Sequence, residues 1–341
     1  MFDDFYKKFP HKNFKIYQEM QAIILHKTGD AGHLKIEKVE DPKPKKDEVI
    51  VRNTAIGVNF FDVAFRRGQY KLDQMPAILG MEACGVIEAL GSEVRDFKVG
   101  ERVAYATGGI GAYAEKKAVN QKLLVIPPQN LTDEVIAGSL FKGLTAHALL
   151  HRVYIAKRSK KILVHAAAGG VGHILCQWAK YLGLEVFGTV GSDEKITAAK
   201  SWGCDHVINY KKQNLVEEVA KITDNGGVGL VYDSVGKDTL IKSLECLWPM
   251  GMCVTFGESS GVVEKFDLNY LTANSLYITR PTTALYKANQ MELVLSADEV
   301  FAALTKGIVK PKITTYAFKD VVKAHRDLEN RATTGSIVLT V

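Results

Sequence analysis

Three glycines near the middle of the chain have the type and spacing of a phosphate-binding turn. They follow a short apolar run at 162–166 and precede apolar residues at helical spacing, namely Val171, Ile174, Leu175, Trp178, Ala179 and Leu182. Gly169 and Gly170 would let the backbone turn tightly and approach a pyrophosphate, and Gly172 would let the helix pack closely on the strand. The N–H groups that begin the helix would face the anion. The order of strand, glycine turn and helix therefore predicts a dinucleotide site.

The end of the next expected strand indicates which dinucleotide is bound. A sheet of this kind selects NAD through an acidic residue at that position, which binds the ribose 2′-hydroxyl. Here Ser192 stands at the strand end and Lys195 follows, whereas Asp193 and Glu194 fit the first turn of a helix. Ser192 can donate to a phosphate oxygen and Lys195 adds positive charge, so the pattern favours NADPH. The alternative is that Ser192 only caps the helix and Lys195 is a solvated side chain.

These residues belong to elements that alternate regularly. Between residues 161 and 279, short apolar runs alternate with helical segments, which is typical of a doubly wound parallel sheet of the Rossmann type. The first strand of this region is predicted at 161–167, and its last helix at 237–247. Shorter β-type runs broken by glycines precede this region. We therefore predict an α/β protein whose site lies in the cleft between two domains. The predicted division is an extension at 1–19, a β-rich domain at 20–141 and 285–341, and a nucleotide-binding domain at 142–284.

The composition is that of an ordinary globular protein. The 341 residues are 47% hydrophobic and 24% charged, and the net charge of +6 is spread along the chain. We therefore expect no nucleic-acid partner, because such binding needs a continuous basic face. The five cysteines stand singly, which suggests neither a disulfide framework nor a CxxC metal site. Residues 1–17 lack the apolar stretch of a secretory signal, and no apolar run approaches membrane-spanning length. We expect a cytoplasmic protein.

Ten short stretches of the chain, taken in order, match the sequence pattern of a known protein family. They are 56–62 (IGVNFFD), 67–70 (RGQY), 80–86 (GMEACGV), 141–145 (FKGLT), 165–172 (HAAAGGVG), 207–210 (VINY), 231–236 (VYDSVG), 256–257 (FG), 275–281 (SLYITRP) and 331–335 (RATTG). With these stretches the chain resembles the zinc-free quinone oxidoreductase branch of the medium-chain dehydrogenase/reductase superfamily, which includes ζ-crystallin. The resemblance implies a Rossmann domain, a β-rich GroES-like catalytic domain, and reduction of quinones by NADPH.

The resemblance also implies roles for individual residues. The pyrophosphate would be held by Gly169, Gly170, Val171 and Gly172. The 2′-phosphate would be surrounded by Ser192, Lys195, Tyr210 and Arg331, and the neighbouring Gly191 belongs to the expected cofactor-binding set. The nicotinamide half would be lined by Asn59, Phe60, Asp62, Lys142, Thr145, Gly257, Arg280 and Pro281. Val235, Phe256 and Ser259 complete the expected cofactor-binding set, and Tyr70 would be the tyrosine of the substrate pocket. One departure is the run Ala-His-Ala at 146–148, where relatives often place aromatic residues, so substrate preference stays open.

The residues themselves argue against a catalytic zinc. Zinc-dependent relatives place a cysteine near Asn59 and a His-Glu pair at Met81 and Glu82, and they insert four clustered cysteines. Met81 cannot act as an imidazole ligand, Asn59 is not a thiolate, and residues 108–127 contain no cysteine. A catalytic zinc needs three protein ligands. We therefore expect no metal site and no reversible alcohol oxidation, which normally uses that Lewis acid.

The expected reaction is reduction of a quinone or a similarly conjugated enone. A quinone is electron-poor, so the protein mainly fixes distance and orientation. Asn59 would hydrogen-bond an acceptor oxygen, Asp62 would fix neighbouring backbone, and Tyr70 would stack on the substrate or donate a proton. The alternatives are that Asn59 only caps a helix, that Asp62 is a first-turn acid, and that Tyr70 is a loop aromatic.

Other residues with reactive side chains are weaker candidates for a catalytic role. His165 lies on a buried strand and is expected to be packed or hydrogen-bonded, whereas His147 is a pocket candidate. Cys84 lies in an apolar run and is expected in the core. The proton donor, the physiological acceptor, the number of electrons transferred per step and the role of the extension stay open.

Two other functions and one assembly are also predicted. The same cofactor site would support an NADPH-dependent reductase of α,β-unsaturated carbonyls or enoyl thioesters. A protein of another class, which binds NADPH but has a structural or RNA-binding role, is the second alternative. Family members usually pair through the last strand of the nucleotide sheet, here from Ser275 to Thr279. An edge with Leu276, Tyr277 and Ile278 is costly to leave unpaired, so a homodimer is expected.

Overall fold

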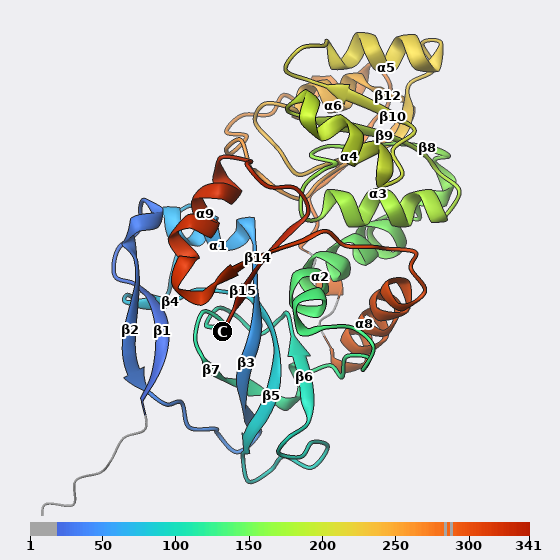
Figure 1. The fold of residues 1–341 in the computed structure, drawn as a ribbon. Coiled ribbons are helices and arrows are strands. Elements are labelled where there is room, and N and C mark those ends of the chain that lie inside the picture. The colour runs from blue at the N-terminus through green and yellow to red at the C-terminus, as the bar shows by residue number, and fades with distance from the viewer. Residues whose placement is uncertain (1–18, 283–284, 287–288) are drawn as a thin grey trace, which may run out of the picture.

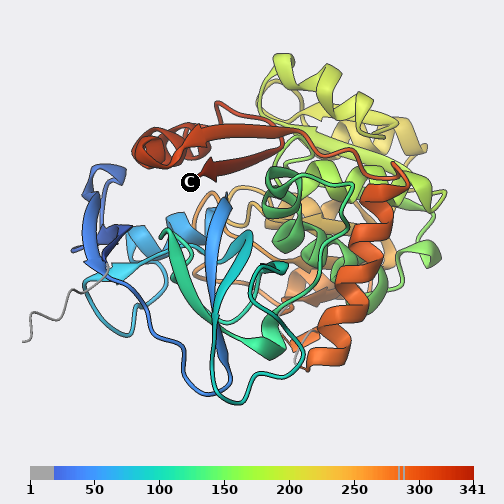
Figure 2. The same ribbon diagram turned by 60° about the horizontal axis from the view of Figure 1, so that its bottom comes forward.

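The computed structural model describes residues 19–282, 285–286 and 289–341. These residues form two lobes, one built around a parallel sheet with helices on its faces and one built mainly of antiparallel strands (Figures 1 and 2). The predicted extension at 1–19 lies outside the described residues except for residue 19, which begins the first strand.

Six parallel strands make the sheet of the first lobe, in the order β10-β9-β8-β11-β12-β13. Their respective bounds are His206–Asn209, Glu185–Val190, Lys161–Val164, Val228–Asp233, Leu247–Thr255 and Tyr277–Thr279. The helices of this lobe are α3 (Gly172–Tyr181), α4 (Ile196–Ser201), α5 (Leu215–Thr223), α6 (Leu240–Glu245) and α7 (Asn269–Thr272). Every residue of β11 is buried, because helices cover both faces of the sheet, and such strands are continuous apolar runs in the sequence. The predicted α/β class and doubly wound sheet are confirmed.

The second lobe combines the N-terminal and C-terminal parts of the chain. One sheet has the order β14-β15-β3-β5-β6 with β7 on β3, and a smaller sheet has the order β2-β1-β4. The strands β1 to β7 are Glu19–Leu25, Leu34–Glu40, Glu48–Val58, Ala77–Ile78, Glu82–Leu90, Arg102–Tyr105 and Lys116–Asn120. The C-terminal elements are β14 (Ile313–Ala317), α9 (Val321–Glu329) and β15 (Ser336–Thr340). Because β15 pairs antiparallel with β3, the two ends of the described chain share one core (Figure 2).

Helix α2 (Asp133–His147) lies between the two lobes. It packs on β3, β5 and β15 on one side and on α3 and α8 (Gln290–Thr305) on the other (Figure 1). The domain boundary predicted at 141/142 falls inside this helix, and the boundary at 284/285 touches residues outside the described part. Both boundaries stay predictions.

Three predicted elements are shorter in the structure. Strand β8 ends at Val164 rather than 167, because Ala166 adopts a left-handed φ of 50° where the turn begins. Helix α6 begins at Leu240 rather than 237, because the residues before it form a turn around the Asp233 carboxylate. The edge strand predicted from Ser275 to Thr279 begins only at Tyr277, because Ser275 has a φ of 51°. Leu276 is buried in the core and precedes the strand, so of the three residues expected to make this edge costly to leave unpaired, only Tyr277 and Ile278 lie on it.

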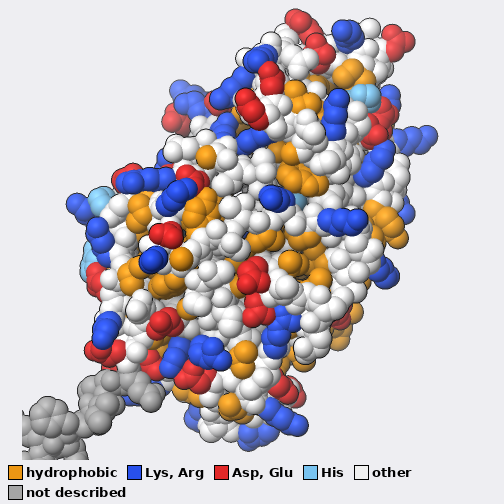
Figure 3. All heavy atoms as spheres, in the orientation of Figure 1, with side chains coloured by type: hydrophobic (Ala, Val, Ile, Leu, Met, Phe, Trp, Pro, Cys, Tyr) orange, Lys and Arg blue, Asp and Glu red, His pale blue; other side chains and the backbone are white. Residues whose placement is uncertain are grey.

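One face of the described chain mixes charges of both signs. On the face shown in Figure 3, Lys and Arg side chains alternate with Asp and Glu and form no continuous basic stripe among the described residues. No described helix is both long and apolar enough to cross a membrane.

Candidate functional site

The glycine turn lies where β8 passes into α3. A Cβ added at Gly172 would lie 2.2 Å from the carbonyl oxygen of Ala166, so only glycine lets the helix start this close to the strand. The N–H of Gly169 donates to the same carbonyl at 2.8 Å, which closes the turn. A Cβ at Gly170 would lie 3.0 Å from Cε of Lys142. The turn therefore has the tight backbone that a pyrophosphate requires, and it brings Lys142 of α2 against it.

A basic cluster lies beyond the end of β9. Nζ of Lys195 donates to the backbone carbonyl oxygens of Arg331 and Thr333, at 2.6 and 3.3 Å, and Nη1 of Arg331 donates to the hydroxyl of Tyr210 at 2.6 Å. Burial lowers the pKa of Lys195, and the charges of Arg331 and Lys211 lower it further. Three positive charges therefore lie close enough to repel one another, which is the environment of an anion site. The structure brings together the residues that the resemblance implied here.

The carboxylates near this cluster are already bound by other residues. Asp193 accepts hydrogen bonds from Nδ2 of Asn209 at 2.6 Å and from Nζ of Lys212 at 2.5 Å, and these bonds lower its pKa. A hydrogen bond from the Ser192 hydroxyl is the main reason that the pKa of Glu194 is lowered. The Ser192 side chain makes no helix-capping bond. The alternative in which Ser192 serves only as a cap therefore loses its support.

Asp233 shapes the loops at the carboxyl ends of β11 and β12. Its buried Oδ1 accepts hydrogen bonds from the N–H groups of Val235 and Gly236, and its carboxylate also accepts from the hydroxyls of Thr239 and Ser243. The same Ser243 hydroxyl lies 3.0 Å from Nε2 of His165, which is fully buried. The prediction of a packed, hydrogen-bonded His165 is confirmed.

The predicted nicotinamide loops meet on this support. The N–H of Ser259 donates to the carbonyl of Ser234, and a Cβ at Gly257 would lie 2.8 Å from the same oxygen. The loop between them therefore packs directly on the residue before Val235, with Phe256 half-buried at its start. Arg280 pairs with Glu258 at 2.8 Å, and Pro281 follows it. The roles predicted for these residues are untested.

On the facing lobe, Glu82 of β5 joins two predicted site residues. Its Oε1 accepts hydrogen bonds from Nδ2 of Asn59 and from Nζ of Lys142, both at 2.9 Å, and its Oε2 accepts from the N–H of Phe141 at 2.7 Å. The side chains of Glu82 and Lys142 are 0% and 5% exposed, so this is a buried ion pair. In the sequence, Glu82 stands out only beside Met81, as half of the pair that is His-Glu in zinc-dependent relatives. Its position, a carboxylate inside a largely apolar strand, was the sequence signal that could have indicated its role in the site.

Asn59 and Asp62 begin α1 (Phe60–Arg67). Oδ2 of Asp62 accepts a hydrogen bond from the backbone N–H of Asn59 at 2.8 Å, so Asp62 caps the helix and the Asn59 amide is left to donate to Glu82. Phe60 follows Asn59 and is half-buried. Both expectations for Asp62, a first-turn acid and a residue that fixes the backbone at Asn59, describe this geometry.

A buried chain of polar groups continues behind Asp62. The hydroxyl of Tyr113 donates to Oδ2 of Asp62 at 3.1 Å and lies 3.0 Å from Nε2 of His325. Burial raises the pKa of Asp62 from 3.8 to about 7, despite the opposing hydrogen bonds from Asn59 and Tyr113. Burial lowers the pKa of His325 to about 3, so this imidazole is neutral. Because Tyr113 has a single proton, His325 carries its own proton on Nε2 and donates it to the tyrosine oxygen when Asp62 is ionised.

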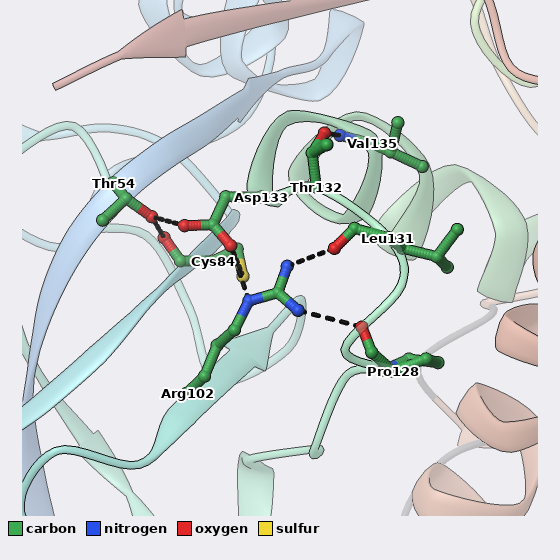
Figure 4. Close-up of polar contacts among 8 residues, drawn as sticks. All are labelled: Thr54, Cys84, Arg102, Pro128, Leu131, Thr132, Asp133 and Val135. Carbon is green, nitrogen blue, oxygen red and sulfur yellow. Dashed lines mark hydrogen bonds and ion pairs between the residues drawn. The ribbon is translucent and has the colours of Figure 1, made fainter.

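A second polar cluster fixes the start of α2 (Figure 4). Nε of Arg102 donates to Oδ1 of Asp133 at 2.6 Å, the Thr54 hydroxyl donates to Oδ2, and Arg102 also donates to the carbonyls of Pro128 and Leu131. These hydrogen bonds outweigh burial and lower the pKa of Asp133. The Cys84 thiol donates to Oδ1 of Asp133, and burial raises its pKa. Cys84 is a core residue, as predicted.

The remaining candidates differ in what they contact. Tyr70 lies in an aromatic group, with its ring centroid 5.0 Å from Phe61 and 5.7 Å from Phe65. The Thr145 hydroxyl donates to the carbonyl of Phe141 within α2. His147 points toward α3 and α8 instead, where Nε2 lies 3.0 Å from Oε2 of Glu299 and the ring packs on Trp178. This position removes the main reason for counting His147 among the pocket residues.

The groups around Glu82 are suited to binding oxygen atoms rather than a cation. An ammonium group and amide N–H groups have hydrogens to donate and no lone pair for a metal. Among the described residues, no group of three His, Cys, Asp or Glu side chains is placed to hold a metal ion.

The fold and the site together define a nucleotide-dependent oxidoreductase with a Rossmann lobe and a GroES-like lobe. Residues 45–129 match the family model described as the alcohol dehydrogenase GroES-like domain, and residues 170–297 match the one described as zinc-binding dehydrogenase. The chain belongs to the quinone oxidoreductase branch of the medium-chain dehydrogenase/reductase superfamily, and it is an oxidoreductase.

Three relatives show how far the similarity extends. The chain is 44% identical to a quinone oxidoreductase of Pseudomonas aeruginosa over 301 residues, which cover 88% of this chain and 92% of that one. It is 40% identical to a 2-haloacrylate reductase of a Burkholderia species over 330 residues, covering 94% and 98% of the two chains. It superposes on the crystal structure of Escherichia coli quinone oxidoreductase complexed with NADPH with a TM-score of 0.92, at 40% identity and with coverage of 94% and 100%.

Proposed function

We propose that the chain is an NADPH-dependent quinone reductase that works without zinc. The observation that carries the choice of cofactor is the basic cluster of Lys195, Lys211 and Arg331 at the end of β9, where nearby carboxylates are bound elsewhere. A phosphate on the ribose would neutralise this cluster, whereas a ribose hydroxyl would not. The NADPH complex of the E. coli relative supports the same choice.

The residues around the expected acceptor site suit a substrate that needs little chemical activation. When bound, NADPH supplies the hydride that, with one proton from solvent, turns a quinone into a hydroquinone and leaves NADP⁺. Asn59 presents an N–H donor to an acceptor oxygen, and Asp62 fixes the backbone from which Asn59 projects. Tyr70 adds an aromatic surface beside α1. The two lobes hold distance and orientation, which is the main requirement for an electron-poor acceptor.

A second candidate is a reductase of α,β-unsaturated carbonyl compounds. The 2-haloacrylate reductase at 40% identity favours it, and the same N–H donor would bind the oxygen of an enone or a carboxylate. A purely structural or RNA-binding role has less support, because the net charge is only +6 and the charges on the face shown in Figure 3 are interspersed.

Steady-state oxidation of NADPH separates these functions. The panel contains 1,4-benzoquinone and 1,4-naphthoquinone beside a 2-alkenal, 2-chloroacrylate and a crotonyl thioester. We expect kcat/KM for the quinones to exceed that for every other acceptor by about tenfold or more. A preference for an alkene acceptor would favour the second candidate, and tight NADPH binding without turnover would refute both.

The proposal includes a homodimer and a cytoplasmic location. Tyr277 is 57% exposed on β13, the terminal strand of the parallel sheet, where a second copy would extend the sheet edge to edge. The location rests on the sequence alone.

A further inference from the structure

We propose that Glu82 is the positioning residue of the acceptor site and that the ammonium of Lys142, which Glu82 orients, binds the acceptor oxygen. This inference rests on the proposed function, since it assumes a carbonyl acceptor. It gives Lys142 a role beyond lining the nicotinamide half of the cofactor, and it gives Glu82 a role in the acceptor site.

Glu82 has no freedom to move. Both carboxylate oxygens are engaged, and the side chain is 0% exposed. A Cβ at Gly57 would lie 2.3 Å from its Oε1, so the carboxylate packs directly against the backbone of β3. The bond from the N–H of Phe141 fixes the carboxylate relative to α2, the helix that carries Lys142. Each group that Glu82 holds is therefore held in one orientation.

Glu82 leaves donors free on both of its partners. An ammonium has three N–H groups and a side-chain amide has two. In the part of the chain that the structure describes, Nζ of Lys142 and Nδ2 of Asn59 each donate to Glu82 and to no other side chain or backbone oxygen. Two N–H groups of Lys142 and one of Asn59 are consequently available to a ligand. They share one carboxylate oxygen as an anchor, so they lie close together.

The position of these donors suits the acceptor rather than the pyrophosphate. The carbon chain of Lys142 passes over Gly170, with Cε 3.0 Å from where a Cβ would stand, and its charged end continues to the GroES-like lobe. Nζ therefore lies on the side of the glycine turn that faces the other lobe. When a quinone or an enone accepts a hydride into its conjugated system, negative charge develops on a carbonyl oxygen, as a hydroquinone anion or an enolate, until solvent protonates it. A fixed, buried ammonium stabilises that charge more than an exposed one does.

A buried ion pair is also compatible with a purely structural role, and a double-mutant cycle separates the two roles. The variants are Glu82→Gln, Lys142→Met and the double variant, with Asp133→Asn as the control. Asp133 also ties α2 to the GroES-like lobe through partly buried hydrogen bonds (Figure 4), but it lies two helical turns before Phe141. For each protein we would measure the thermal midpoint without ligand, the NADPH dissociation constant by fluorescence, and kcat and KM for 1,4-naphthoquinone.

If Glu82 acts through Lys142, each single variant loses about 10- to 100-fold in kcat, and the double variant loses no more than the worse single one. NADPH affinity stays within about threefold, and Asp133→Asn lowers the thermal midpoint while kcat stays within about twofold. Losses in kcat that multiply in the double variant would overturn the proposal. So would a Glu82→Gln variant whose thermal midpoint falls while its kcat is unchanged, or a Lys142→Met variant that loses NADPH affinity but keeps kcat.

Failure of the proposed function has a different result. If the wild-type protein reduces a 2-alkenal but no quinone, quinone reduction is refuted, and the same cycle run on the alkenal decides the role of Glu82, because that acceptor also has a carbonyl oxygen. If the wild-type protein binds NADPH but reduces no acceptor, both proposals are refuted.

Discussion

Arg331→Gln should weaken NADPH binding and leave NADH binding unchanged. Arg331 is exposed and its guanidinium is oriented by the Tyr210 hydroxyl at 2.6 Å, toward the place where a 2′-phosphate would neutralise Lys195. Nζ of Lys195 binds the backbone carbonyls of Arg331 and Thr333, so the loop stays anchored when the arginine side chain is removed. The substitution therefore removes a charge without removing the support of the loop.

The expected change in the NADPH dissociation constant follows from the kind of hydrogen bond that is lost. A hydrogen bond to a charged group contributes about 1.5–3 kcal/mol, which corresponds to about a 10- to 150-fold change in the dissociation constant. Because the guanidinium is exposed to solvent and screened, we expect the lower end, about tenfold. Tyr210→Phe should cost less, about two- to threefold, since it only releases the orientation of Arg331.

Fluorescence titration with NADPH and NADH measures this effect directly. Arg326→Gln is the matched control, because Arg326 is an exposed arginine on α9 that pairs with Asp30 away from the cluster. The difference between wild type and Arg331→Gln should shrink as salt is added. The reasoning is refuted if Arg331→Gln changes the affinities for NADPH and NADH by the same factor, or changes neither.

Three further predictions test other parts of the structure. Gly172→Ala should lose roughly 2–4 kcal/mol of stability and should also lose NADPH binding, because its Cβ would lie 2.2 Å from the Ala166 carbonyl oxygen. Thermal melts and NADPH titration measure both losses. The control is Gly169→Ala, whose Cβ would lie 3.1 Å from that oxygen, and an equal loss in this variant would contradict the reasoning. The raised pKa of Asp62, from 3.8 to about 7, means that the folded state binds more protons than the unfolded state between these values, so wild-type stability should fall as pH rises through that window. Asp62 contributes at most about 4 kcal/mol to this change in the free energy of unfolding, and the Asp62→Asn variant lacks the contribution. Urea unfolding of both proteins at about pH 5 and pH 8 measures the difference. An identical pH dependence in the two proteins would argue against the reasoning. Tyr277→Asp on the terminal strand should convert the proposed homodimer to a monomer, as measured by light scattering. The control Tyr181→Asp, at a position on α3 that is 64% exposed, should stay dimeric. A monomeric wild-type protein would refute the proposed homodimer.

Local patterns in the sequence determined the fold class and the phosphate turn. Apolar runs and helical spacing report on a few residues at a time, and the strand, the glycines at 169–172 and the helix that follows are contiguous, so the turn could be recognised before any folding was known. The choice of Ser192 and Lys195 as phosphate ligands also came from one short stretch. Tyr210 and Arg331 came only from the family resemblance, because they lie far from that stretch in the chain.

The tertiary structure decided which polar groups meet. Glu82 and Lys142 are 60 residues apart, Lys195 and the Arg331 carbonyl are 136 apart, and Tyr113 and His325 are 212 apart. Periodicity identifies each of these residues only as lying on a strand, a helix or a loop. Which side chain reaches which partner depends on how two lobes, made from interleaved parts of the chain, pack around α2. A buried carboxylate such as Glu82 requires donors for both oxygens, and only the packed structure shows that Asn59, Lys142 and the backbone of Phe141 supply them.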